Sequence, residues 1–208
     1  MNPLQLILGD EEFLIDRATS SIIRAVRSTM QSNPEELPIT KLRAGDVTPS
    51  EISELLSPSL FAEDRVVILA AAGEAGKEAV STIEQAVKEP APGVVLIVIH
   101  SGGGRAKNLV KILKNAGADV TECPKLTKFS EREDFVVNEF RNLGVRPSRD
   151  TVHALLDAIG GDLRELASAV SQLVADTGGR VDPAAVRRYY AGIAGVTGFQ
   201  VADETIAG

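Results

Sequence analysis

The sequence predicts an α/β fold in which a largely parallel sheet is followed by a small helical region. Two observations lead to this prediction. Up to about residue 125, short apolar runs alternate with segments of helical periodicity, which is the pattern of βαβ units. Beyond Pro124 only helical patterns remain. We therefore expect two domains, one spanning residues 1–125 and the other residues 126–208.

The first domain is expected to contain five strands and four helices. The strands are short apolar runs at residues 4–8, 39–42, 66–71, 94–99 and 119–123. Apolar residues at helical spacing predict helices at residues 11–31, 50–56, 78–88 and 106–115. The run at 94–99 is apolar throughout, which is typical of a strand in a sheet covered on both faces. Thr48 is expected to cap the second helix.

The second domain is expected to be a small bundle of three or four helices. Helical patterns lie at residues 130–143, 148–159, 162–176 and 183–191. Glycines separate them, at Gly144, at the pair Gly160-Gly161 and at the pair Gly178-Gly179. Glycine commonly ends helices because it adopts a left-handed conformation without steric cost.

Composition narrows the class of protein. The chain has 208 residues, a net charge of −7 and a pI near 5.0, so its whole surface is not suited to holding DNA, although a local basic patch is not excluded. Cys123 is the single cysteine, which rules out an intrachain disulfide. No signal-peptide pattern and no run long enough for a membrane span is present. We expect a cytoplasmic protein with no membrane partner.

The loop after the first strand lacks the pattern that nucleotide binding requires. A phosphate loop reads G-x-x-x-x-G-K-[ST] between a strand and a helix. This chain reads GDEEFL at residues 9–14, without the lysine or the second glycine. Its carboxylates would repel phosphate, so we expect no intact ATP site there.

A partial match to a phosphate loop, AAGEAGKE, lies at residues 71–78. Ala71 replaces the first glycine and Glu78 replaces the hydroxyl that would bind magnesium. A turn into a capped helix is the simpler interpretation.

A second loop, SGGGR at residues 101–105, opens a basic helix. It could hold an anion at the helix N-terminus, or it could be a flexible surface loop. The candidate contacts to DNA or another anion are Arg105, Lys107, Lys111 and Lys114. A solvated charged face is the alternative interpretation of these four residues.

The rest of the chain offers no convincing active site. His100 and His153 are predicted to lie in different domains, and one cysteine cannot supply a zinc set. No G-x-S-x-G nucleophile motif occurs. We expect no catalytic residue, no metal and no cofactor.

An apolar pair, Leu60 and Phe61, lies in the polar, proline-interrupted segment LSPSLFAED at residues 56–64. Pro58 argues against a regular element at this point. Either the loop tucks back to cover the base of the next strand, or the pair is held out for a partner.

Four segments together resemble the delta subunit of the bacterial DNA polymerase III clamp loader. They are LILGDEEFLIDRA at 6–18, LSPSLFAEDRVVIL at 56–69, IGGDLRELASAVSQL at 159–173 and GVTGFQVADETIAG at 195–208. Their order and spacing match along the full chain. The resemblance implies an ATPase-type fold of the AAA+ kind, with a RecA-like first domain that has no working nucleotide site and a three-helix second domain.

The resemblance also implies a role and partners. In that family an exposed Leu-Phe pair enters a hydrophobic cleft on the sliding clamp, the beta subunit of DNA polymerase III. The matching positions are Leu60 and Phe61, preceded by Ser59. The related clamp motif often carries an upstream glutamine, and here Leu56 and Ser57 occupy that region. The implied function is to bind and open the clamp, as a non-catalytic subunit of a DNA-directed DNA polymerase (a nucleotidyltransferase).

Assembly and DNA contact follow from the same resemblance. A third, collar domain would normally follow residue 208, so the chain looks like an N-terminal fragment. Without the collar, we expect weakened contact with the other clamp-loader subunits and an indirect link to DNA. The alternative function is a nucleotide-binding enzyme with a degenerate loop, in which Gly76, Lys77 and residues 101–105 would hold the phosphates.

Overall fold

The computed structural model describes residues 1–29, 34–58 and 64–190. The chain divides into two compact units, Met1–Lys125 and Leu126–Gly208, and each is considered by itself. No helix in the described part of the chain combines the length and the apolarity that a bilayer crossing requires.

The first unit is built on a five-stranded sheet in the order β2-β3-β4-β1-β5. The strands are β1 (Leu4–Gly9), β2 (Ile39–Arg43), β3 (Arg65–Ala70), β4 (Val94–His100) and β5 (Asp119–Cys123). Every neighbouring pair is parallel, which confirms the predicted α/β class. The apolar β4 lies in the middle of the sheet, between β3 and β1, where both of its edges are hydrogen-bonded.

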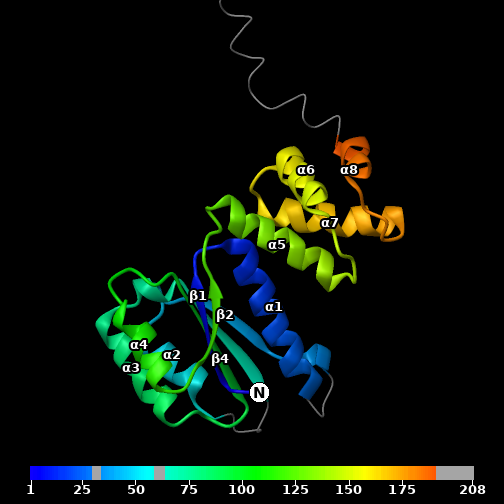
Figure 1. The fold of residues 1–208 in the computed structure, drawn as a ribbon. Helices are drawn as coiled ribbons and strands as arrows, with labels where there is room; N and C mark the ends of the chain where they lie inside the picture. The colour runs from blue at the N-terminus through cyan, green and yellow to red at the C-terminus, as the bar shows by residue number, and fades with distance from the viewer. Residues whose placement is uncertain (30–33, 59–63, 191–208) are drawn as a thin grey trace, which may run out of the picture. The chain divides into compact units, whose positions relative to one another are not determined.

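Helices cover both faces of this sheet (Figure 1). They are α1 (Glu12–Thr29), α2 (Pro49–Leu56), α3 (Lys77–Lys88) and α4 (Asn108–Asn115). Successive strand residues point to opposite faces, so Ile7 and Ile97 pack with α1, while Leu6 and Val98 pack with the other three helices. Two separate apolar cores therefore hold the sheet rigid.

The second unit consists, in its described residues, of four helices around one small core. They are α5 (Phe129–Asn142), α6 (Arg149–Ile159), α7 (Leu163–Thr177) and α8 (Pro183–Tyr190). Phe140, Leu155, Leu166 and Val186 are fully buried. The helix positions agree with the sequence prediction to within one or two residues.

Two features differ from the sequence prediction. The fourth helix begins at Asn108 rather than at residue 106, because Ala106 still belongs to the turn that precedes it. Short 3-10 segments occur at Pro34–Glu36 and Ala72–Glu74. Segments of three residues are too short to leave a periodic pattern in the sequence.

Gly9 is required where β1 ends. It has φ +147°, and a Cβ atom there would lie 1.9 Å from the carbonyl oxygen of Cys123. The same carbonyl accepts a hydrogen bond from the Glu11 amide at 3.0 Å. The chain that leaves β1 therefore packs closely against Cys123 at the end of β5.

A capping box fixes the start of α2. The Thr48 amide donates to the Glu51 carboxylate at 2.8 Å, and the Glu51 amide donates to the Thr48 hydroxyl at 3.3 Å. Hydrogen bonds from Thr48 lower the pKa of Glu51; the bond from the Thr48 amide has the larger effect and the bond from its hydroxyl the smaller one. Ile52 and Leu56 anchor the other side of the helix in the core.

We predict that Gly9→Ala destabilises the protein by about 2 kcal/mol or more, because alanine is strained at positive φ and its methyl group would strike Cys123. Gly76→Ala is the matched control, since Gly76 has φ −71° and nothing lies within 4 Å of the place that an added methyl group would take. Urea unfolding of both variants checks the prediction. Equal stabilities would contradict it.

We predict that Glu51→Ala lowers stability at neutral pH and that the difference from wild type narrows in acid. A carboxylate with a lowered folded-state pKa stabilises above its unfolded pKa, about 4.3, and that contribution is lost as pH falls through the folded value. Urea unfolding at pH 7 and pH 3 measures the effect. Glu54→Ala, another exposed glutamate of α2, is the control, and an equal narrowing there would count against the capping box.

Candidate functional site at the carboxyl ends of the strands

The loops with partial phosphate-binding signals all lie at one edge of the sheet. In open parallel sheets, ligands bind at the carboxyl ends of the strands. The loops that follow β1, β3 and β4 leave the sheet at this edge. The segments 9–14, 71–78 and 101–105 lie there, and the first two run on into the first residues of α1 and α3.

The loop after β1 has its backbone already in use. The amide of Glu11 is bonded to Cys123, and Gly9 is packed on the same carbonyl. Asp10 lies 3.9 Å from the Lys125 ammonium group, an exposed and weak ion pair. The Glu11 amide is thus already used, and the carboxylates of Asp10, Glu11 and Glu12 do not suit a phosphate group.

The loops after β3 and β4 pack directly on each other. A Cβ atom on Gly73 would lie 2.6 Å from the Gly103 carbonyl oxygen. A Cβ atom on Gly104 would lie 2.5 Å from the Gly73 carbonyl oxygen. The amide of Ala106 donates to the Gly73 carbonyl at 3.0 Å. Of the three consecutive glycines, only Gly104 lies where a side chain would strike the neighbouring loop. Residues 101–105 are exposed, so they form a surface loop that contacts the loop after β3.

His100, at the end of β4, forms hydrogen-bond contacts with the loop that follows it. Its side chain is fully buried, and its Nδ1 accepts a hydrogen bond from the Gly102 amide at 2.8 Å. Its Nε2 lies 3.2 Å from the Ala106 carbonyl oxygen. An acceptor at Nδ1 and a donor at Nε2 define the neutral Nε2–H tautomer. This structural role was not predicted from the sequence, although a lone histidine at the end of an apolar strand was a signal for it.

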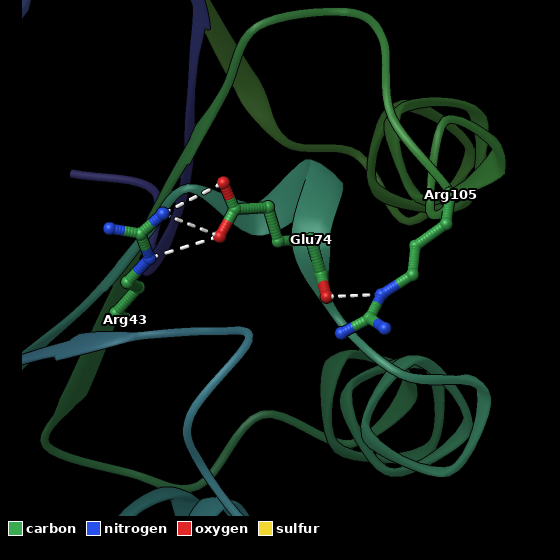
Figure 2. Close-up of polar contacts among 3 residues, drawn as sticks. All are labelled: Arg43, Glu74 and Arg105. Carbon is green, nitrogen blue, oxygen red and sulfur yellow. Dashed lines mark hydrogen bonds and ion pairs between the residues drawn. The ribbon is translucent and has the colours of Figure 1, made fainter.

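Glu74 joins three loops at this edge through its side chain and its backbone (Figure 2). Nε and Nη2 of Arg43, at the end of β2, donate to its two carboxylate oxygens at 2.9 and 2.8 Å. On the other side, Nε of Arg105 donates to its main-chain carbonyl at 2.5 Å. The hydrogen bonds and charge of Glu74 raise the pKa of Arg43. The cluster fastens loops together and leaves no free nucleophile or base.

The structure divides the four predicted anion contacts into two groups. All four are exposed: Arg105, Lys107, Lys111 and Lys114. Arg105 is bonded to Glu74, and Lys114 lies 3.8 Å from Glu122. Lys107 and Lys111 have no ion pair among the described residues. They are one helical turn apart on the exposed side of α4, so the basic face is smaller than the sequence suggested.

The predicted clamp-binding residues Ser59, Leu60 and Phe61 lie outside the described residues. Their flanks are described. The last residue of α2, Leu56, is buried, and Nη2 of Arg65 at the start of β3 donates to the carbonyl of Ser57. Both ends of the segment are therefore attached to the core of the first unit.

No cluster of three or more potential metal ligands occurs in the described residues. Burial raises the pKa of the Cys123 thiol, and the nearby Glu122 carboxylate raises it further. The thiol is therefore a poor nucleophile.

The fold is similar to that of a solved clamp-loader protein. The Bacillus subtilis DNA clamp loader delta protein matches with a TM-score of 0.71 and 22% identity, over 90% of this chain and 58% of its own length. This chain thus spans less than two thirds of that protein. The likeness confirms the predicted fold class, an α/β domain with a parallel sheet followed by a small helical domain. The RuvB Holliday junction branch migration motor of Thermotoga maritima matches with a TM-score of 0.48 and 11% identity, over 89% of this chain and 60% of its own.

No curated protein matches the chain. A protein family does match: residues 6–124, more than half of the chain, fit the family described as DNA polymerase III, delta subunit. The match includes both the carboxylate-rich loop after β1 and the segment at 56–64. The resemblance seen in the sequence is therefore confirmed, and the chain belongs to the DNA polymerase III delta subunit family.

Proposed function

We propose that the chain is a non-catalytic clamp-loader subunit that binds the sliding clamp through Leu60 and Phe61, with Ser59 beside them, and favours the open ring. The observation that carries this proposal is the family match over residues 6–124, which includes this segment. Binding and opening need no covalent chemistry. A ligand that binds the open ring more tightly than the closed ring shifts the population toward the open form.

The described flanks suit a binding segment. Buried Leu56 holds the segment at the end of α2, and the bond from Arg65 to Ser57 joins its two ends. A short segment between fixed ends loses less conformational entropy on docking than a free tail would. Full burial of the Leu60 and Phe61 side chains would contribute about 1.5–3 kcal/mol each.

ATP hydrolysis is assigned to other subunits in this proposal. The bonded Glu11 amide and the carboxylates after β1 support it, as do the packed loops after β3 and β4. The same observations disfavour a degenerate nucleotide-binding enzyme, because Gly103 and Gly104 of the loop 101–105 are packed against Gly73 and Arg105 is bonded to Glu74. The proposed partners are the clamp and the other clamp-loader subunits, in the cytoplasm.

DNA contact by the basic helix stays a secondary proposal. Lys107 and Lys111 are exposed and lack an ion pair among the described residues, so they can reach phosphate without breaking a bond. Arg105 and Lys114 would first have to release Glu74 and Glu122. A contact of this size would guide DNA rather than hold it.

We predict that the double variant Leu60→Ala, Phe61→Ala binds the sliding clamp at least about 100-fold more weakly, because two apolar side chains are lost from the contact. Surface plasmon resonance against immobilised clamp measures the affinity. Val120→Ala, which shortens an apolar side chain that is 38% exposed on β5, is the control and should bind like wild type. Unchanged binding by the double variant, with its helical content preserved, would disprove the assignment.

We predict no saturable binding of labelled ATP with magnesium up to about 1 mM, the upper end of ordinary KM values. The physical reason is that the loop after β1 carries carboxylates and that the loops after β3 and β4 pack on each other. Equilibrium titration checks this. Micromolar binding that is lost in Lys77→Ala would instead support the nucleotide-binding enzyme.

A further inference from the structure

Two adjoining hollows lie on the helical unit around the turn between α5 and α6. They share Gly144, Val145 and Arg146 in their linings. Arg141, in the last turn of α5, lines one of them, and Arg180, between α7 and α8, lines the other. We call the surface formed by Arg141, Arg146 and Arg180 the arginine hollow.

The two loops that border the arginine hollow lie close to each other. A Cβ atom on Gly179 would lie 3.6 Å from Cγ2 of Val145. The Val145 amide donates to Phe140 at 2.9 Å, and the Gly179 amide donates to Val174 at 2.9 Å. These bonds close the ends of α5 and α7, so the three arginines extend from a well-defined base.

None of the three arginines has an ion pair or a side-chain hydrogen bond among the described residues. Elsewhere in the same unit, Arg149 pairs with Glu133 at 3.1 Å and Lys128 with Glu131 at 3.6 Å. The one acidic residue in the linings is Asp182. Its Oδ1 is occupied by the Ala185 amide at 2.7 Å, as the cap of α8. Asp182 keeps its negative charge as a cap, so the two linings together carry three positive side chains and one negative side chain, and a net positive charge remains.

Helix dipoles do not cancel this charge either. The carboxyl ends of α5 and α7 lie at the hollow, and each carries a partial negative charge. The amino ends of α6 and α8 follow directly on the same two loops, and each carries a partial positive charge of similar size. The two contributions oppose one another, so the three guanidinium groups set the local field.

We propose that the arginine hollow binds backbone phosphates of DNA. Guanidinium groups match phosphate oxygens in a two-pronged hydrogen bond, and a cluster without carboxylate partners meets them without first breaking an ion pair. The choice of DNA among polyanions rests on the proposed clamp-loader function. The hollow presents arginines and turn backbone rather than a row of aromatic side chains, so the contact is independent of sequence.

The test uses the full chain and a labelled 20-base-pair duplex in fluorescence anisotropy, over a series of salt concentrations. The triple variant Arg141→Ala, Arg146→Ala, Arg180→Ala should bind at least about tenfold more weakly at low salt. The slope of log K against log salt should fall in magnitude by about 2.7, which is three phosphate contacts at about 0.9 each. The triple exchange to lysine should keep most of the slope and lose only part of the affinity.

A control variant removes the same charge elsewhere: Arg24→Ala, Arg27→Ala, Lys41→Ala, all exposed positions of the first unit. It should keep wild-type DNA affinity and slope. If both triple variants lost the same DNA affinity, the effect would come from net charge alone, and the proposal would be overturned. Unchanged DNA binding by the arginine variant would overturn it as well. Binding of a polyglutamate peptide that depends on these arginines, with DNA binding intact, would also overturn it.

Clamp binding separates this inference from the proposed function. The arginine variant should bind the clamp like wild type, because Leu60 and Phe61 are unchanged. If the arginine variant loses DNA affinity but still binds the clamp, both proposals are supported. If it keeps both DNA affinity and clamp binding, DNA binding by the arginine hollow is disproved and the proposed function is not affected.

Discussion

The carboxyl edge of the sheet depends on one close backbone contact, between the loop after β3 and the loop after β4. Gly73 and Gly104 approach so closely that neither position has room for a side chain. The Ala106 amide bonds across the contact, and buried His100 supports it. Because the loops are held together, Glu74 is placed where Arg43 and Arg105 can both reach it.

This contact bears on phosphate binding at the carboxyl edge, where open parallel sheets hold their ligands. Of the backbone amides there, that of Glu11 bonds to the Cys123 carbonyl and that of Ala106 bonds to the Gly73 carbonyl. The residues on either side of the proposed clamp-binding segment belong to the opposite edge, since Arg65 starts β3 and pairs in register with Val94 at the start of β4. Six strand residues separate the two edges, about 20 Å. The flanks of the proposed clamp-binding segment are therefore about one strand length away from the packed loops.

The sequence predicts the elements well and their contacts poorly, for a physical reason. Strands and helices leave periodic apolar patterns, so all five strands and the four main helices of the first unit can be found from residues close together in the chain. The cluster at Glu74 joins positions that are 31 residues away on either side. Nothing in the local sequence brings them together. The local sequence therefore favours a ligand contact for Arg105, whereas the structure shows it bonded to a carbonyl.

The arginine hollow also could not be predicted from the sequence, because its positive charge depends on contacts that only the fold creates. Residues 126–208 contain eight arginines and Lys128 as their lone lysine, in a chain whose net charge is −7. Composition alone gives no reason to expect a positive surface there. The fold decides it, because it pairs Arg149 with Glu133. It also gathers Arg141, Arg146 and Arg180 around adjoining hollows in which Asp182 is the one acidic residue. Local charge in a protein is set by which partners the fold supplies, and an acidic protein can therefore carry a site for an anion.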